Sequence, residues 1–213
     1  MNEEVLLSTA YFPPAEYFSL MARSNKVTIE RFENYIKQTY RNRCMILGAN
    51  GPIPLIVPVL RGSIHKTPLK DLRIDNGRKW RELHLRGIIS AYASAPFFEY
   101  YFDSISRVIS KPYNFLTDLN NEALTAVCEA AGMEVQLSYT RGFIPLGEHE
   151  HDYRYSITPK RDSGVTGYTE KPYRQVFQER YGFISRLSII DLLLNNGPGT
   201  LSLLKESLAA DNY

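Results

Sequence analysis

The chain has 213 residues, 44% of them hydrophobic, and a formal net charge of +2 at pH 7. That size and composition suit one domain with an ordinary core, and we expect a single domain over residues 1–213. The small charge argues against nucleic acid as a partner, which needs basic residues clustered on one face. No apolar run reaches the ~18 residues of a membrane-spanning helix.

Cysteine usage and the N-terminal residues indicate a compartment. Cys44 and Cys128 lie far apart and form no CxxC pair, so we interpret them as free thiols in a reducing environment. The first residues carry acids where a signal peptide would carry Lys or Arg. We therefore expect a cytoplasmic protein.

The N-terminal part has the pattern of a crossover unit. Residues 5–12 resemble a buried strand ended by Pro13-Pro14, and residues 15–23 place apolar side chains at helical spacing. In residues 26–32, apolar and polar side chains alternate as in a strand. Strand, helix and strand within about thirty residues predict a β-α-β unit.

The next feature is a turn between two apolar runs. Asn50-Gly51 is a strong hairpin signal because both residues tolerate positive φ. The turn is not a phosphate loop, since it lacks a Lys-Ser/Thr pair and is followed by a β-branched run interrupted by proline. The chain also lacks the GxSxG and GxGxxG motifs of hydrolases and dinucleotide-binding proteins.

The rest of the chain is mostly helical in pattern. The spacing predicts a short strand over 70–74, helices over 79–94, 97–109 and 116–131, a strand over 133–139, a long charged loop over 146–167, and tail helices over 175–180, 189–194 and 199–208. We expect an α/β or α+β fold. Its mixed sheet opens with the β-α-β unit and the hairpin, and its middle and C-terminal parts are helical.

Arg41, Asn42 and Arg43 precede the hairpin. On one strand Arg41 and Arg43 would point to the same face, because side chains repeat every two residues. Such a pair could clamp a phosphate or carboxylate. The alternative is a solvated strand edge with cross-strand partners. Cys44 would face the opposite side from Arg43 and starts an apolar run. This position favours a buried, inert thiol over a nucleophile.

Trp80, His84 and Tyr92 fall on one face of the predicted 79–94 helix, at spacings of one and two turns. His84 could act as a general base with a pKa near neutrality, and Trp80 could stack on a sugar or base. The alternative is a helix that faces the core, with a histidine that makes one hydrogen bond there.

Three other polar sites are weaker. His149 and His151, with neighbouring carboxylates, resemble a metal site but lack a defined ligand set, so a solvated loop is favoured and no metal is expected. His65, in the loop after the hairpin, could meet an anionic substrate. Asp191 lies inside an apolar run and is interpreted as structural, paired with Arg186 or with a backbone amide.

Several blocks spread along the chain form a recognisable set. They are Tyr11-Phe12-Pro13-Pro14 with Glu16-Tyr17-Phe18, Asn42-Arg43 before the strand that reaches Gly51 and residues 55–59, Trp80 and His84 with residues 92–98, and residues 173–177, 182–183 and 187–193. This set resembles the WbqC-like protein family, bacterial proteins often associated with O-antigen-type surface-polysaccharide gene clusters. The likeness touches nearly the whole chain.

The resemblance implies a role in surface-polysaccharide biosynthesis, and by analogy an aminoacyl, acyl or glycosyl transfer on a nucleotide-linked sugar. The expected substrate is a small molecule or sugar conjugate, and no cofactor is indicated. Family members commonly carry His-Gln-Pro after the first strand, whereas this chain has Ser8-Thr9-Ala10. That departure keeps a second hypothesis open, a non-catalytic ligand-binding or assembly protein of the same pathway.

The transferase hypothesis gives each candidate residue a role. His84 is the base. The predicted substrate-binding residues are Tyr11, Arg41, Asn42, Arg43, Trp80 and Tyr92. An enzyme should place Arg43, His84 and Tyr11 around one concave pocket.

Overall fold

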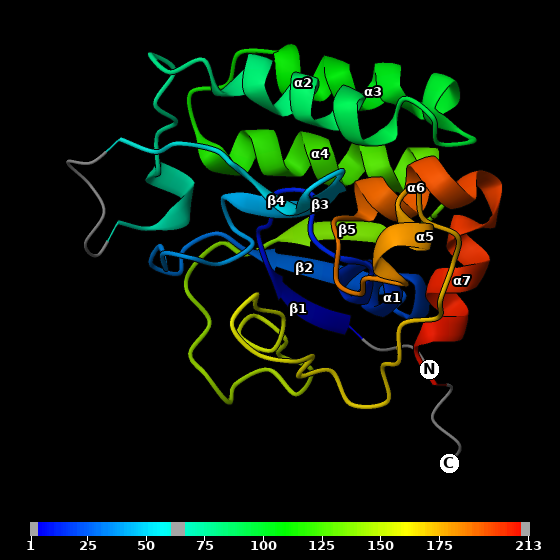
Figure 1. Ribbon diagram of the computed structural model, residues 1–213. Coiled ribbons are helices and arrows are strands. Elements are labelled where there is room, and N and C mark those ends of the chain that lie inside the picture. The colour runs from blue at the N-terminus through cyan, green and yellow to red at the C-terminus, as the bar shows by residue number, and fades with distance from the viewer. Residues whose placement is uncertain (1–3, 61–66, 210–213) are drawn as a thin grey trace.

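The computed structural model of the chain describes residues 4–60 and 67–209 (Figure 1). The predicted site at His65 lies outside the described residues. The strands are β1 (Glu4–Ser8), β2 (Lys26–Glu30), β3 (Arg43–Gly48), β4 (Gly51–Ile56) and β5 (Gln136–Tyr139). The helices are α1 (Ala15–Arg23), α2 (Trp80–Tyr92), α3 (Phe98–Ser110), α4 (Leu116–Ala130), α5 (Gln178–Tyr181), α6 (Ile189–Asn196) and α7 (Thr200–Ser207), with 3-10 turns η2 (Leu69–Asp71) and η3 (Gly197–Gly199).

The mixed α/β fold expected from the sequence is confirmed. Strands β1, β2 and β5 form a parallel sheet in the order β1-β2-β5. The register pairs Val5 with Val27 and Leu7 with Ile29, so the apolar residues of the first two strands meet across the sheet. Helix α1 connects β1 to β2, which completes the predicted β-α-β unit.

The predicted hairpin is also confirmed. Strands β3 and β4 pair antiparallel and form a separate two-stranded sheet, in which Gly48 lies opposite Gly51. Gly51 has a φ of 107°, a conformation that side-chain-bearing residues rarely adopt. The turn therefore depends on this glycine.

Helices cover the parallel sheet. Helices α2 and α3 run side by side along one side of the molecule, where α3 packs against α4 and α2 packs directly on the β3–β4 hairpin (Figure 1). Helices α1, α6 and α7 pack together near the other end of the sheet. No helix in the described part of the chain is long and apolar enough to cross a membrane.

The predicted strand over 70–74 is wrong. Leu69 begins the 3-10 turn η2, and residues beyond it make only isolated bridges, between Ile74 and Val59 and between Arg73 and Phe115. Leu69 and Leu72, three positions apart, are both fully buried. A spacing of three matches the period of a 3-10 helix, which places both side chains on one side of the turn.

The long charged loop is confirmed, and it lies along the outer edge of β1. The described residues 140–177 contain no helix or strand (Figure 1). The loop is tied to the sheet because Leu6 N donates to His151 O at 3.0 Å and Tyr153 N donates to Leu6 O at 2.9 Å. This pairing places the residues after His151 at the edge of the sheet.

Candidate functional site

The carboxyl ends of the parallel strands meet at one edge of the sheet. Ser8 ends β1, Glu30 ends β2, and Thr140 follows β5 directly. In open α/β sheets, ligands bind in the crevice outside this edge. The candidate site therefore lies at these strand ends.

Glu30 is a fully buried carboxylate that accepts hydrogen bonds on both of its oxygens. Its Oε1 accepts from Phe32 N at 2.7 Å and from Thr140 Oγ1 at 2.9 Å. Its Oε2 accepts from Ile144 N at 3.0 Å and from Arg154 Nη1 at 3.3 Å. These bonds replace the hydration that the charged group loses on burial. They also tie the end of β2 to the long loop.

Arg154 is held equally firmly. Its Nε and Nη2 donate to the two carboxylate oxygens of Asp152 at 2.9 and 2.6 Å, and its Nη1 also donates to Ile144 O at 2.8 Å. Burial alone would raise the pKa of Asp152, but the hydrogen bonds and charge of Arg154 outweigh it and lower the pKa. The pair stays ionised inside the protein.

A second buried pair lies beside the first. Arg41 donates through Nε to Glu33 Oε1 at 3.1 Å and through Nη2 to Glu33 Oε2 at 2.6 Å. The Ser8 hydroxyl donates to the same Glu33 Oε1. The Tyr155 ring lies against both arginines, with its centroid 5.6 Å from Arg41 Cζ and 5.7 Å from Arg154 Cζ.

The charges of this network decide what it can bind. Three carboxylates face two guanidiniums, so the buried groups carry one negative charge in excess. The fork of Arg41, predicted to hold an anionic substrate, is occupied by Glu33. The network therefore has no spare positive charge, and an anion needs cations from elsewhere.

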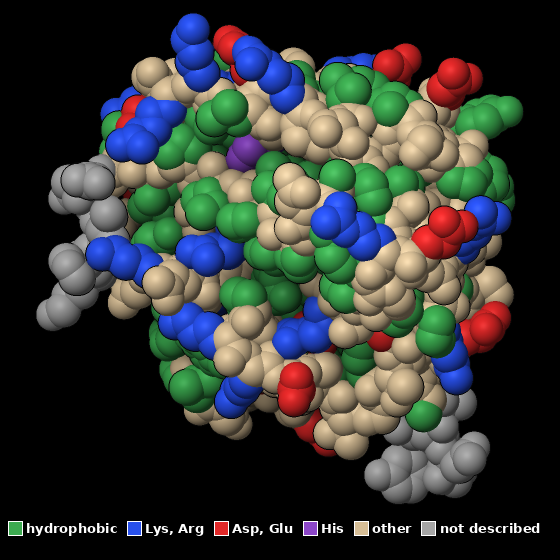
Figure 2. All heavy atoms as spheres, in the orientation of Figure 1, with side chains coloured by type: hydrophobic (Ala, Val, Ile, Leu, Met, Phe, Trp, Pro, Cys, Tyr) green, Lys and Arg blue, Asp and Glu red, His purple; other side chains and the backbone are tan. Residues whose placement is uncertain are grey.

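A pocket of about 290 Å³ lies over the network and contains those cations. Its walls include Arg41, Arg154, Tyr155 and Ile157 and the exposed Lys160 and Arg161. A smaller hollow shares Arg41, Arg154 and Ile157 and reaches Ser8-Thr9-Ala10. We call the two together the strand-end cleft. In the space-filling view, several Lys and Arg side chains gather over the part of this face where the long loop runs (Figures 1 and 2).

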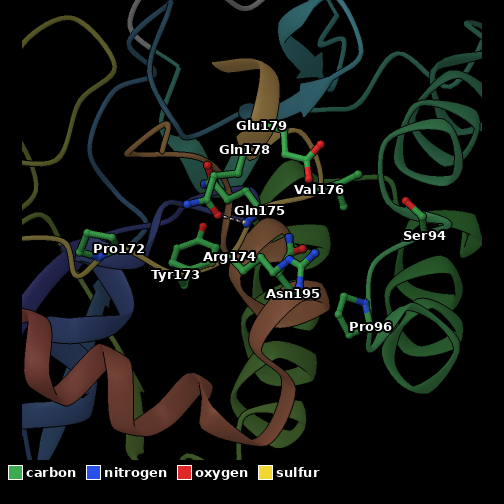
Figure 3. Close-up of a pocket in the computed structure, with 10 residues that line it drawn as sticks. All are labelled: Ser94, Pro96, Pro172, Tyr173, Arg174, Gln175, Val176, Gln178, Glu179 and Asn195. Carbon is green, nitrogen blue, oxygen red and sulfur yellow. Dashed lines mark hydrogen bonds between the residues drawn. The ribbon is translucent and has the colours of Figure 1, made fainter. Parts of the chain in front are cut away.

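A wider hollow of about 940 Å³ lies elsewhere on the surface, between residues 94–96, residues 172–179 and Asn195 (Figure 3). Its most central amide is already used. Gln175 Nε2 donates to Ile184 O at 2.8 Å, and Gln175 Oε1 accepts from Ile184 N at 2.9 Å. The Gln175 amide is bonded to the backbone of Ile184 through both of its polar atoms and is not available to a ligand. For this reason we place the candidate site at the strand-end cleft.

The predicted aromatic face of α2 exists, but it faces the core. His84 is 3% exposed, and its Nε2 lies 3.2 Å from Ile56 O, which can only accept, so Nε2 carries the proton. Nδ1 then accepts from Tyr11 OH at 2.9 Å. The Trp80 ring packs edge-on against the imidazole at 5.0 Å. Burial lowers the pKa of His84 to about 4.

These contacts favour the structural alternative for His84, and its role as a base stays a prediction. We expect His84→Ala to lower the free energy of unfolding by about 2–4 kcal/mol, because it leaves a cavity and two polar groups without partners. His84→Gln, which can still donate to Ile56 O, should lose less than half of that. Urea unfolding measures both. A variant of unchanged stability that has lost activity would instead support the base.

The remaining predicted residues lie apart from one another. Tyr92 OH donates to Asp191 Oδ2 at 2.9 Å inside the protein, and Asn42 Nδ2 donates to Val57 O at 2.8 Å. The expected clamp of Arg41 and Arg43 depended on one strand through both residues, but β3 begins only at Arg43. Only Arg41 reaches the strand-end cleft.

The histidine-rich segment pairs with β1, the outer strand of the parallel sheet. The carbonyl of His151 pairs with β1, and Asp152 pairs with Arg154. Within residues 4–60 and 67–209, no group of three or more His, Cys, Asp or Glu is placed to hold a metal ion. Asp191 is buried and paired, as predicted, but with tyrosines; Arg186 pairs with Glu16 instead.

The sequence interpretation missed most of the cleft. The missed residues are Ser8, Glu30, Glu33, Asp152, Arg154, Lys160 and Arg161. One usable signal was the adjacent pair Lys160-Arg161 inside a long loop, since long ordered loops are often functional. The buried ion pairs join residues up to 124 positions apart, which no spacing rule connects.

The fold and the site define an α/β protein with a cleft at the carboxyl ends of a parallel sheet. Comparison with known proteins then gives the family. The model of the "WbqC-like protein family" matches residues 9–163, and the chain belongs to this family. The matched span includes Glu30, Glu33, Arg41, Arg154 and Lys160, whereas residues 172–179 of the wider hollow lie beyond it.

One relative matches over nearly the whole chain. The chain is 26% identical over 221 residues to "Uncharacterized protein Rv1507c" of Mycobacterium tuberculosis (strain ATCC 25618 / H37Rv), a match that covers 92% of this chain and 95% of the relative. No solved structure matches the chain significantly. The comparisons therefore define the family and leave the reaction to be argued from the site.

Proposed function

We propose that this protein is a transferase of bacterial surface-polysaccharide biosynthesis, of the O-antigen type, that binds an anionic sugar conjugate in the strand-end cleft. The observation that carries the proposal is a pocket whose exposed cations, Lys160 and Arg161, lie above a buried network in which every guanidinium is already paired with a carboxylate. Within the described part of the chain, neither cation forms an ion pair. Family membership supports the pathway.

The size and charge of the pocket suit the phosphorylated part of a substrate. Ligand pockets usually span about 300–1,000 Å³, so about 290 Å³ accommodates a sugar phosphate or the diphosphate of a nucleotide-linked sugar. Lys160 and Arg161 would hold the phosphate oxygens, since Arg and Lys are the usual partners of phosphate. The transferred group is aminoacyl, acyl or glycosyl.

The smaller hollow, of about 10 Å³, has room for about one water molecule, so the reacting end of the substrate would stop at its mouth. There the Ser8 hydroxyl donates to Glu33, and the fork of Arg41 orients that carboxylate. Glu33, which lines neither hollow, is the base through Ser8 in this proposal: the attacking group gives its proton to the Ser8 hydroxyl, which passes its own to Glu33. As the new bond forms, the bond to the leaving group breaks, while the loop cations hold the phosphate side. Glu33→Gln would then lower turnover and leave substrate affinity within about threefold.

The compartment is part of the proposal. Cys44 and Cys128 are buried free thiols, and burial raises the pKa of each to about 12. Thiols of this kind are unreactive and suit the reducing cytoplasm. Nucleotide-linked sugars would meet the protein there.

Thermal-shift measurements with nucleotide-linked sugars and acyl thioesters test the binding. A ligand at about 100 times its Kd stabilises the folded state by about 2.7 kcal/mol, which raises Tm by about 5–10 °C for a chain of this size. The variant Lys160→Ala/Arg161→Ala should lose most of that shift. Arg86→Ala/Lys205→Ala removes two exposed cations elsewhere and should keep it.

Equal shifts in the two double variants would place the anion outside the cleft and overturn the assignment. A shift that depends on Lys160 and Arg161, without any transfer reaction and without an effect of Glu33→Gln, would favour the non-catalytic ligand-binding hypothesis. Ser8-Thr9-Ala10 at the end of β1, where relatives carry His-Gln-Pro, is the feature behind that second hypothesis.

A further inference from the structure

The loop that supplies the cations is a closed segment. Gly164 N donates to Ser156 O at 3.2 Å, so the two ends of residues 155–164 meet, and we call this segment the cationic loop. Lys160 and Arg161 lie near its middle. Arg161 Nη2 donates back to Tyr155 O at 2.8 Å, which links the cation to the start of the loop.

One side chain outside the loop holds it from behind. Arg186 Nη2 donates to Thr158 O at 2.8 Å, and Arg186 Nη1 donates to Arg161 O. These carbonyls flank Lys160. A guanidinium can make such contacts together because its donors form a rigid planar fork.

Arg186 is itself fixed on the side of the core. Its Nη2 lies 2.9 Å from Oε1 of Glu16, a fully buried carboxylate in the first turn of α1. Its backbone N donates to Glu170 Oε2 at 2.7 Å. The residue has a φ of 62°, a conformation that a non-glycine residue keeps only when its surroundings determine it.

We infer that Arg186 is a positioning residue for the anion site. It connects the rigid helix α1 to the cationic loop and so sets where Lys160 and Arg161 stand in the strand-end cleft. Among the described residues that line the pocket, Arg186 is absent, so it acts through the loop. The effect on ligand binding rests on the proposed function, whereas the effect on the loop does not.

Hydrogen exchange of the unliganded full chain tests the effect on the loop. Arg186→Lys keeps a cation beside Glu16 but loses the fork, so amides in residues 155–164 should exchange about tenfold faster while the rest of the chain is unchanged. Arg23→Lys is the matched control. Arg23 also forks onto a backbone carbonyl, donating through Nε and Nη2 to Lys205 O at 3.1 and 2.6 Å, at the other end of α1.

The inference is overturned if the loop in Arg186→Lys exchanges as in the wild type, or if exchange rises equally over the whole chain. In the second case Arg186 would serve general stability alone. Slower or unchanged exchange of the loop in Arg23→Lys is required for the control to hold.

Calorimetric titration with inorganic pyrophosphate tests the effect on binding. Arg186→Lys should weaken the Kd about tenfold, and Arg23→Lys should leave it within about twofold. A loosened loop with unchanged affinity would overturn the positioning role in binding. A wild-type protein that binds no pyrophosphate would count against the proposed function, and the exchange measurement would still decide whether Arg186 fixes the loop.

Discussion

Replacing Arg154 by Met is expected to lower the free energy of unfolding by about 3–5 kcal/mol, since it removes one partner of buried ion pairs. Glu30 is fully buried and would keep only its uncharged donors, while Asp152 would lose both bonds of the guanidinium fork. An uncompensated buried charge is the costliest outcome of such a change. Tm should fall by about 10 °C or more.

Urea unfolding of matched variants measures this effect. Arg86→Met breaks an ion pair with Glu82 in which both side chains are exposed, and such pairs contribute at most about 1 kcal/mol. The triple variant Arg154→Met/Glu30→Gln/Asp152→Asn removes the charges together and should recover part of the loss. Equal losses for Arg154→Met and Arg86→Met would contradict the assignment of Arg154 to the buried network.

Replacing Asp191 by Asn is expected to stabilise the protein relative to the wild type as the pH rises. Asp191 is buried, and burial raises its pKa from 3.8 to about 6, although hydrogen bonds from Tyr92 and Tyr173 act in the opposite direction. The folded state therefore binds the proton more tightly than the unfolded state. Stability from this group is complete below pH 3.8 and is lost as the pH rises to about 6.

The size of the effect follows from linkage. A pKa change from 3.8 to about 6 corresponds to roughly 3 kcal/mol, so the stability of Asp191→Asn minus that of the wild type should rise by about this amount between about pH 4 and pH 7. Burial also raises the pKa of Glu170, to about 7, and the charge of Asp191 adds to that rise, so the comparison is made in a Glu170→Gln background. A difference that does not vary with pH would refute the prediction.

The buried and the exposed cations of the cleft have different physical roles. Arg41 and Arg154 form ion pairs with carboxylates inside the protein, in the network that joins β1, β2 and the long loop. Lys160 and Arg161 are exposed and keep their charges for solvent or a ligand. A basic residue that lines a pocket is therefore a candidate for binding an anion only if no carboxylate of the protein already pairs with it.

Local features of the sequence determined the secondary structure and the family. The Asn50-Gly51 turn predicted the β3–β4 hairpin because such a turn needs a positive φ, which glycine adopts without strain. Apolar spacing gave helices α1 to α4 with ends close to those observed, since one buried face repeats every 3.6 residues. These signals are local, and each element could form from its own pattern.

Spacing patterns did not predict whether a helix face meets the core or a pocket. Trp80, His84 and Tyr92 share a face of α2 at the predicted spacing, yet spacing alone does not say whether that face meets a pocket or the core. The structure packs it against Tyr11, Ile56 and Leu47. The helix was predictable, and the role of its polar residues was not.

Only the tertiary structure decided the cleft. Ser8 and Glu33 meet because parallel strands place their carboxyl ends side by side, and Arg154 reaches Glu30 because the long loop pairs with Leu6 of β1. Such contacts join distant segments and depend on the register and edge pairing of the whole sheet, which no short stretch of sequence encodes. The elements and the family were thus predictable from the sequence, whereas the strand-end cleft follows from how those elements pack.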